Sequence, residues 1–197
     1  MITILDYGAG NLRSVENTLA EIGANFRVTR AAAEVSAAEK LILPGVGHFG
    51  QMLNALDERG LREPLLEKVR AGVPFLGICL GLQAMFEGSD EAPEMRGFGL
   101  FPGQVRRFPA RARVPHMGWN EIAPRAGSRL LRETGERPYV YFANSYYCPV
   151  VEATAATCRY ELDFTAALEH ENVFGVQFHP EKSGPLGLKI VRNFVEL

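Results

Sequence analysis

The chain has 197 residues, 47% hydrophobic and 22% charged, a length and balance that fit one domain over residues 1–197 with a single substantial core. Its formal net charge of -2 gives no electrostatic reason to expect nucleic acid or an anionic membrane as a partner. No apolar run is as long as a membrane span and the N-terminus lacks a basic region, so we expect a cytoplasmic protein. Three widely spaced cysteines favour neither a disulfide framework nor a zinc site, and we expect no metal and no cofactor.

In the first half of the chain, apolar segments alternate with amphipathic ones, which is typical of parallel strands joined by helices. Strands are expected at 2–6, 25–29 and 40–43, and helices at 12–22, 31–39, 49–56 and 63–70. The glycine-rich turn at 7–11 lacks the third glycine of a dinucleotide-binding loop, because Arg13 stands there, and no nucleotide site is expected. Asn11 is the expected N-cap of the first helix.

A glycine-rich loop at residues 44–50 follows the third strand. Ligands of open α/β sheets bind beyond the carboxyl ends of the strands, so this loop is expected near the site. Its backbone N–H groups could bind a developing oxyanion, as acyl transfer requires, although a plain flexible turn would have the same composition. His48 is interpreted as the first residue of the next helix rather than as a base.

Residues 73–83 predict a buried strand, a sharp turn at Cys79 and a helix whose first turns contain residues 82–86. The pattern from Gly77 to Gly81 has the form of a nucleophile elbow with cysteine as the nucleophile. Such a turn places Cys79 at a helix N-terminus, where the helix dipole favours the reactive thiolate. The alternative is a buried structural cysteine at a strand end.

The second half of the chain is predicted to be mostly β, with strands at 98–108, 114–122, 139–147, 155–164 and 173–178 and a final helix at 186–194. A central mixed sheet whose later strands are antiparallel would accommodate both halves. Near the end, an apolar strand stops at His179, and Glu181 follows two residues later. A cysteine nucleophile needs a base and a third group that orients the base, and Cys79, His179 and Glu181 supply these side chains.

The sequence resembles the class I, or triad, glutamine amidotransferases. The segments GICLGLQ at 77–83 and HPE at 179–181 are similar to the signature of that family. Further segments, DYGAGNL at 6–12, PGVG at 44–47, PHMGWN at 115–120 and HPEKS at 179–183, resemble the glutaminase subunits of imidazole glycerol phosphate synthases. The resemblance implies an α/β fold of three layers, α/β/α, with a central mostly parallel sheet and antiparallel strands from the C-terminal half.

The resemblance also implies a chemistry. Glutamine would be hydrolysed to glutamate and ammonia through a thioester on Cys79, with His179 oriented by Glu181. The remaining implied residues form an oxyanion hole at Gly45, Val46, Gly47 and Leu80, and a glutamine site at Gln83, Ser145 and Tyr146. One departure is Asn144, because many relatives carry histidine at this position.

The implied partner is a (β/α)8-barrel cyclase of the HisF type, which would form a heterodimer with this chain and use the ammonia to make imidazole glycerol phosphate and AICAR. Trp119, Asn120, Tyr141 and Lys182 match positions associated with that interface and its gating. Members of the family are typically almost inactive until the barrel binds its nucleotide, and a rearrangement of residues 44–47 is the expected switch. The alternatives are a glutaminase of another pathway, such as anthranilate or aminodeoxychorismate synthesis, and a catalytically silent binding module.

Overall fold

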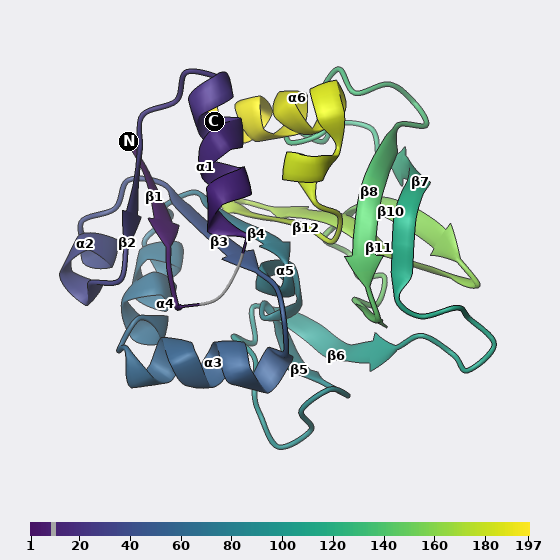
Figure 1. The fold of residues 1–197 in the computed structure, drawn as a ribbon, viewed down its shortest axis with the longest axis horizontal. Helices are drawn as coiled ribbons and strands as arrows, with labels where there is room; N and C mark the ends of the chain where they lie inside the picture. Colours follow the sequence, from purple (N-terminus) through teal and green to yellow (C-terminus); the bar gives the residue numbers. More distant parts are fainter. Residues whose placement is uncertain (9–10) are drawn as a thin grey trace.

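The computed structural model describes residues 1–8 and 11–197, so the turn expected at 7–11 falls partly on residues 9 and 10, outside the described residues. Within the described part, nine strands form one mixed sheet in the order β2-β1-β3-β4-β12-β11-β10-β7-β8 (Figure 1). These strands are β1 (Ile2–Leu5), β2 (Phe26–Thr29), β3 (Leu41–Gly45), β4 (Phe75–Cys79), β7 (His116–Pro124), β8 (Tyr139–Asn144), β10 (Thr154–Tyr160), β11 (Leu162–His170) and β12 (Val173–Val176).

The sheet has a parallel half and an antiparallel half. Strands β2, β1, β3, β4 and β12 are parallel, and β11, β10, β7 and β8 follow in antiparallel pairs. The mixed sheet expected from the sequence is therefore confirmed. In the register of β3 and β4, Gly45 lies opposite Cys79, and β12 pairs with the other edge of β4. The carboxyl ends of three parallel strands thus meet at one edge, because parallel neighbours end on the same side of a sheet.

Helices cover both faces of the parallel half. They are α1 (Leu12–Glu21), α2 (Ala32–Ser36), α3 (Phe49–Glu58), α4 (Arg62–Arg70) and α6 (Gly184–Val195). Figure 1 shows α1 and α6 together on one side of the sheet and α2, α3 and α4 on the other. Alternate strand residues supply the two cores: Ile4 and Ile42 pack with the core of α1 and α6, whereas Leu5 and Leu43 pack with that of α3 and α4. Among the described residues, no helix has both the length and the apolar character needed to cross a bilayer.

Several predicted elements differ from the structure. The helix after Cys79 is a single turn, α5 (Leu80–Gln83), and Phe86 begins the unpredicted strand β5 (Phe86–Ser89), which pairs with β6 (Phe101–Arg107). The strand predicted at 139–147 divides into β8 and β9 (Tyr146–Tyr147), and β9 pairs with β6. The strand predicted at 155–164 is two strands, β10 and β11, because the chain turns at Glu161 with a positive φ of 62°.

Two residues that the sequence places at helix starts occupy those positions in the structure. His48 precedes α3, and its Nδ1 accepts the N–H of Gly50 at 3.2 Å, so its expected place at the helix start is confirmed. Asn11 is at the expected N-cap position of α1, but its side chain makes no capping hydrogen bond to the helix backbone. Its Oδ1 instead accepts the hydroxyl of Ser14 at 2.8 Å. An Asn side chain that has a local hydroxyl donor no longer needs a backbone N–H.

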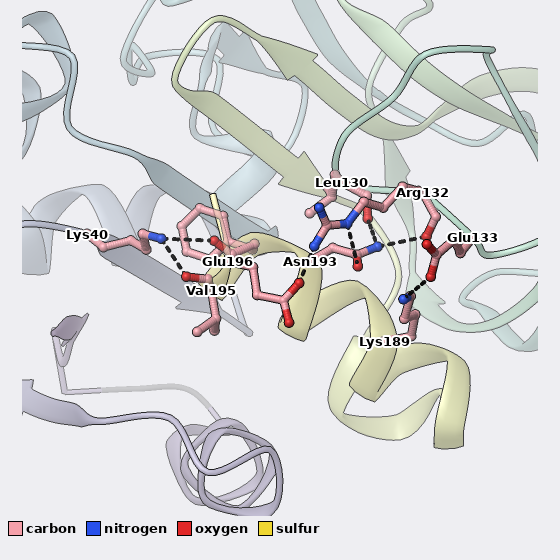
Figure 2. A network of polar contacts seen from close by, with 9 residues as sticks. Lys40, Leu130, Arg132, Glu133, Lys189, Asn193, Val195 and Glu196 are labelled. Carbon is pink, nitrogen blue, oxygen red and sulfur yellow. Dashed lines mark hydrogen bonds and ion pairs between the residues drawn. The ribbon is translucent and has the colours of Figure 1, made fainter.

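Polar contacts connect the C-terminal helix α6 to the rest of the fold (Figure 2). Fully buried Asn193 donates to the carbonyl oxygens of Leu130 and Arg132, each at 2.9 Å, and its Oδ1 accepts from Arg132 Nε at 3.2 Å. Lys40 donates to the carbonyl oxygen of Val195 at 2.7 Å, where the negative end of the helix dipole favours a cation. Helix α6 begins shortly after His179, so these contacts also hold that part of the site in place.

Candidate active site

Cys79 is the last residue of β4 and stands in a strained conformation, with φ 54° and ψ -106°. A positive φ is costly for a non-glycine residue and is frequent at nucleophile elbows. A Cβ on Gly81 would lie 2.1 Å from the carbonyl oxygen of Leu43, and a Cβ on Gly77 would lie 2.5 Å from that of Gly81. The two glycines are therefore required by the close approach of the backbone to itself, as expected from the sequence.

His179 and Glu181 form a buried pair, with Nδ1 of the histidine 2.8 Å from Oε1 of the carboxylate. Burial, the largest influence on His179, disfavours its charged form, but hydrogen bonds to Cys79 and Glu181 outweigh it and raise the pKa of His179 to about 10. The imidazole is therefore protonated at neutral pH, beside the Cys79 sulfur. The second oxygen of Glu181 is buried and has no hydrogen-bond partner among the described residues.

The segment that carries this pair is fixed to the neighbouring strand β8. The N–H of His179 donates to the carbonyl oxygen of Tyr141 at 2.8 Å. The hydroxyl of Ser183 donates to the carbonyl oxygen of His179 at 2.7 Å and accepts the N–H of Tyr141 at 3.0 Å. These contacts fix the backbone of His179, and the hydrogen bond to Glu181 then fixes the rotation of its imidazole ring.

A cavity of about 290 Å³ opens beside Cys79. The sequence-predicted residues that line it are Val46, Gly47, Cys79, Leu80, Gln83, Ser145, Tyr146, His179 and Lys182. Glu181 contacts His179 and does not line the cavity. Gly45 also lies outside the lining, where a Cβ would meet that of Leu80 at 2.7 Å. Leu80 is the first residue of α5, so its N–H is free of the helical hydrogen-bond ladder.

The glycine-rich loop is held by a tyrosine that the sequence analysis did not select. The N–H of Val46 donates to the hydroxyl of Tyr7 at 3.2 Å, and that hydroxyl donates to the carbonyl oxygen of Val46 at 3.3 Å. Burial raises the pKa of Tyr7 to about 12, so the neutral hydroxyl can both donate and accept. In this arrangement the N–H of Val46 is engaged by Tyr7 and does not serve as an oxyanion donor.

Two amide side chains meet at the wall of the cavity. Gln83 donates from Nε2 to the carbonyl oxygen of Tyr146 at 3.1 Å and to Oε1 of Gln177 at 3.0 Å. Asn144 donates from Nδ2 to the same carbonyl oxygen at 2.9 Å, and its Oδ1 is buried without a partner among the described residues. Two of the predicted glutamine-binding residues, Gln83 and Tyr146, are thus joined by a hydrogen bond. The third, Ser145, lines the cavity, and among the described residues it makes no hydrogen bond to either side chain.

Three of the four predicted interface residues lie together. The rings of Trp119 and Tyr141 are 6.1 Å apart, and the ammonium of Lys182 lies 5.9 Å from the centre of the Tyr141 ring. Asn120 is not part of this group. Its side chain donates to the carbonyl oxygen of Arg159 at 3.3 Å and lies 3.3 Å from the ring of His116, because neighbouring residues of a strand point to opposite faces.

A family model described as "Glutamine amidotransferase class-I" matches residues 3–197. The chain belongs to this family. Among solved structures, it resembles a glutamine amidotransferase with a TM-score of 0.78 at 20% identity, covering 99% of this chain and 97% of that one. It also resembles PurLQS from Thermotoga maritima, with a TM-score of 0.74 at 20% identity over 99% of this chain and 97% of that one. These structural likenesses show the shared α/β fold.

The similar curated proteins include family members named imidazole glycerol phosphate synthase subunit HisH. The protein from Desulfitobacterium hafniense is 47% identical over 98% of this chain and 93% of its own length. The protein from Methanothermobacter thermautotrophicus is 48% identical over 100% of this chain and 98% of its own length. The protein from Deinococcus radiodurans is 49% identical over 98% of this chain and 92% of its own length. This amidotransferase therefore matches these relatives along almost the whole length of both chains.

The structure adds three residues to the site of this amidotransferase that the sequence analysis missed. They are Tyr7 on the glycine-rich loop, Gln177 beside Cys79, and Glu91, which lines the cavity and accepts the N–H of Phe49 at 2.8 Å. Gln177 had one available signal, because it stands two residues before His179 and so lies on the same side of an extended chain. Tyr7 belongs to the family-like segment at 6–12, but nothing in that segment marks its contact with Val46, and Glu91 had no signal, since its contact joins distant parts of the chain. Among the described residues, no group of His, Cys, Asp and Glu side chains is arranged to hold a metal ion.

Proposed function

We propose that this chain is the glutaminase subunit of an imidazole glycerol phosphate synthase and that residues 1–197 form a single catalytic domain. Its relatives of that name share 47 to 49% of their residues with it. The observation that supports the chemistry best is the convergence of Cys79, at a strained turn, and the buried His179–Glu181 pair on one cavity. A silent binding module would not need this costly backbone conformation.

In the first half of the proposed reaction, the Cys79 thiolate attacks the side-chain amide carbon of glutamine, and the carbonyl electrons move to the oxygen. The protonated His179 then gives its proton to the amide nitrogen as the C–N bond breaks. Ammonia leaves and a glutamyl thioester remains on Cys79. The N–H of Leu80 and one from the loop of Gly45, Val46 and Gly47 are the proposed oxyanion donors.

In the second half, the now neutral His179 takes a proton from water, and the hydroxide adds to the thioester carbon. The C–S bond breaks, so glutamate leaves and the thiolate and imidazolium are restored. Gln83, Ser145 and Tyr146 line the cavity and are proposed to hold the glutamine. The chemistry needs neither a cofactor nor a metal, because nucleophile, acid and base are all side chains of this chain.

The proposed partner is a (β/α)8-barrel cyclase that receives the ammonia in a heterodimer. Strands β7 and β8 expose apolar side chains beside the cavity, with Met117 64% and Trp119 56% accessible. Trp119 lies opposite Tyr141 in the pairing of β7 and β8. Lys182 lines the cavity, and its ammonium lies over the ring of Tyr141. An apolar face that continues into the mouth of an ammonia-releasing cavity suits a partner that excludes water from the transfer.

We also propose that the pair works in the cytoplasm. Cys79 must remain a free thiol to act, and Cys148 and Cys158 are free as well. Reducing compartments keep thiols in this state.

The test is glutamate production from glutamine by the purified chain, alone and with a bacterial cyclase plus its nucleotide ligand. We expect little activity alone and strong activity in the complex. Cys79→Ala should abolish glutamine hydrolysis, yet the complex should still form its product from added ammonia. Activity indifferent to the cyclase would indicate a glutaminase of another pathway, and silence beside an active reference glutaminase would indicate a binding module.

A further inference from the structure

Gln177 is a fully buried residue that contacts the proposed nucleophile. It follows β12 directly, and its Nε2 lies 3.5 Å from Sγ of Cys79, a distance at which an amide N–H donates to sulfur. Its N–H donates to the carbonyl oxygen of Ala166 at 2.8 Å, which fixes its backbone to the neighbouring strand β11. A polar amide in a site closed to solvent needs partners, and here one of them is the reacting atom.

The backbone carbonyl of Tyr146, connected to Gln177 through Gln83, determines which end of the Gln177 amide faces Cys79. The carbonyl oxygen of Tyr146 can only accept, so the atom of Gln83 that lies 3.1 Å from it must be the NH2 group. The same NH2 group lies 3.0 Å from the amide of Gln177, so the atom of Gln177 on that side must be its oxygen. The other end of Gln177, which faces Cys79, is therefore its NH2 group.

A second contact agrees with this orientation. The thiol of Cys148 lies 3.9 Å from Oε1 of Gln177. Burial raises the pKa of Cys148 well above its usual value, so this thiol keeps its proton at neutral pH and can donate it to that oxygen. The contact with Gln83 thus fixes the orientation of the Gln177 amide, and the contact with Cys148 is compatible with it.

We infer that Gln177 is a catalytic residue, whose amide N–H donates to the Cys79 sulfur and stabilises it as the thiolate. The inference rests on the proposed function, in which Cys79 is the nucleophile. A hydrogen bond to the charged form of a group favours that form. The donor would act in both halves of the reaction, because the sulfur carries negative charge before it attacks glutamine and again when the thioester breaks.

The contacts of Gln177 also link the nucleophile to the wall of the proposed glutamine site. From Tyr146 the contacts run through Gln83 and Gln177 to Cys79. Gln83 makes both of its contacts from one NH2 group, whereas Gln177 uses its oxygen for Gln83 and its NH2 group for Cys79, so neither amide can turn over without losing both contacts. The position of the sulfur is thereby fixed relative to β9, which contains Tyr146.

The experiment measures the rate at which iodoacetamide alkylates Cys79 as a function of pH, in the full-length protein. Alkylation requires the thiolate, so the midpoint of the profile reports the thiolate pKa whether or not glutamine is the substrate. In Gln177→Met, which has similar length and no donor, we expect the midpoint to rise by about one pH unit, a tenfold smaller thiolate fraction below it. In Gln177→Glu we expect a larger rise, because a second negative charge would face the sulfur.

The matched control is Cys148→Ser, which alters the same buried cluster but keeps a donor to Oε1 of Gln177. Its alkylation midpoint should equal that of the wild type. Circular dichroism establishes whether each variant is folded. If Gln177→Met does not fold, the alkylation midpoint of Gln177→Glu tests the inference instead. An unchanged midpoint in the folded variants, or an equal shift in the control, would overturn the inference. A shifted midpoint in a protein that never hydrolyses glutamine would instead overturn the proposed function alone.

Discussion

The hydroxyl of Tyr7 contacts both the N–H and the carbonyl oxygen of Val46, at 3.2 Å and 3.3 Å. The Tyr7 side chain thus binds both backbone polar groups of Val46, a residue of the glycine-rich loop. Gly47, the next residue, has a φ of +96° and no atom within 4 Å of the position of a Cβ, so the loop has room to rearrange beyond this contact. The contact favours the arrangement in which Val46 cannot donate to an oxyanion.

Tyr7→Phe should therefore raise glutaminase activity in the absence of a partner. The change removes both hydrogen bonds of the hydroxyl, and at about 1 kcal/mol each their loss corresponds to a rise of about thirtyfold in the population of the released loop. The measurement is glutamate production by the isolated chain. Tyr160→Phe is the control, because it removes a hydroxyl that donates to the carbonyl oxygen of Arg113, and neither residue lines the cavity. Unchanged or reduced activity in Tyr7→Phe would show that the contact does not restrain the loop.

Glu181→Gln should move the alkaline limit of activity to lower pH. The carboxylate helps to raise the pKa of His179 to about 10, and the neutral amide would remove that contribution. His179 would then lose the proton that the departing ammonia needs at a lower pH. The measurements are the pH profile of glutaminase activity in the complex and the NMR titration of the His179 ring, and an unmoved titration would contradict the prediction.

The same pair should make the stability of the protein depend on pH. A folded pKa of about 10 lies above the usual value of 6.5, so the folded state binds this proton more tightly than the unfolded state does. The resulting stabilisation is complete below about pH 6.5 and is lost as the pH rises through about 10. Urea unfolding at a series of pH values should show the wild type losing more stability across this range than Glu181→Gln does.

Trp119→Ala should weaken binding of the cyclase by about thirtyfold, corresponding to about 2 kcal/mol for a central aromatic anchor. The indole is 56% exposed and stacks edge-on against Tyr141, so its removal leaves the catalytic cavity unchanged. The measurement is the dissociation constant by calorimetry. Val150→Ala removes an apolar side chain that is 51% exposed outside this face, and it should leave the affinity unchanged. Equal effects of the two variants would place the docking surface elsewhere.

Asn193→Leu should lower the free energy of unfolding by about 3 kcal/mol, because it leaves two buried carbonyl groups without donors. Those carbonyls belong to Leu130 and Arg132, at the contact between α6 and the loop before β8 (Figure 2). Urea denaturation provides the measurement. Lys189→Ala removes an exposed ion pair of the same region, with Glu133, and should have little effect. A stable Asn193→Leu variant would show that the loop can satisfy its carbonyls in another way.

The sequence alone determined the parts of this protein that depend on local pattern. The alternation of apolar and amphipathic segments predicted the order of strands and helices in the first half of the chain. Glycines on both sides of Cys79 predicted the sharp turn, because only residues without a Cβ fit so close to the neighbouring backbone. His179 and Glu181 could be selected as the proposed base and orienting acid because a nucleophile needs both, and both followed an apolar strand.

The tertiary structure decided what depends on contacts between distant residues. The turn at Glu161 divides two long strands without a glycine or proline, so no local signal marked it. Val46 is held by Tyr7, 39 residues away, and the Cys79 sulfur accepts from Gln177, 98 residues away. Asn120 points away from Trp119 because the pleat of β7 sends neighbouring side chains to opposite faces, and only the sheet shows which face is which. Pairings of this kind have no period along the chain, because packing chooses them when the strands come together.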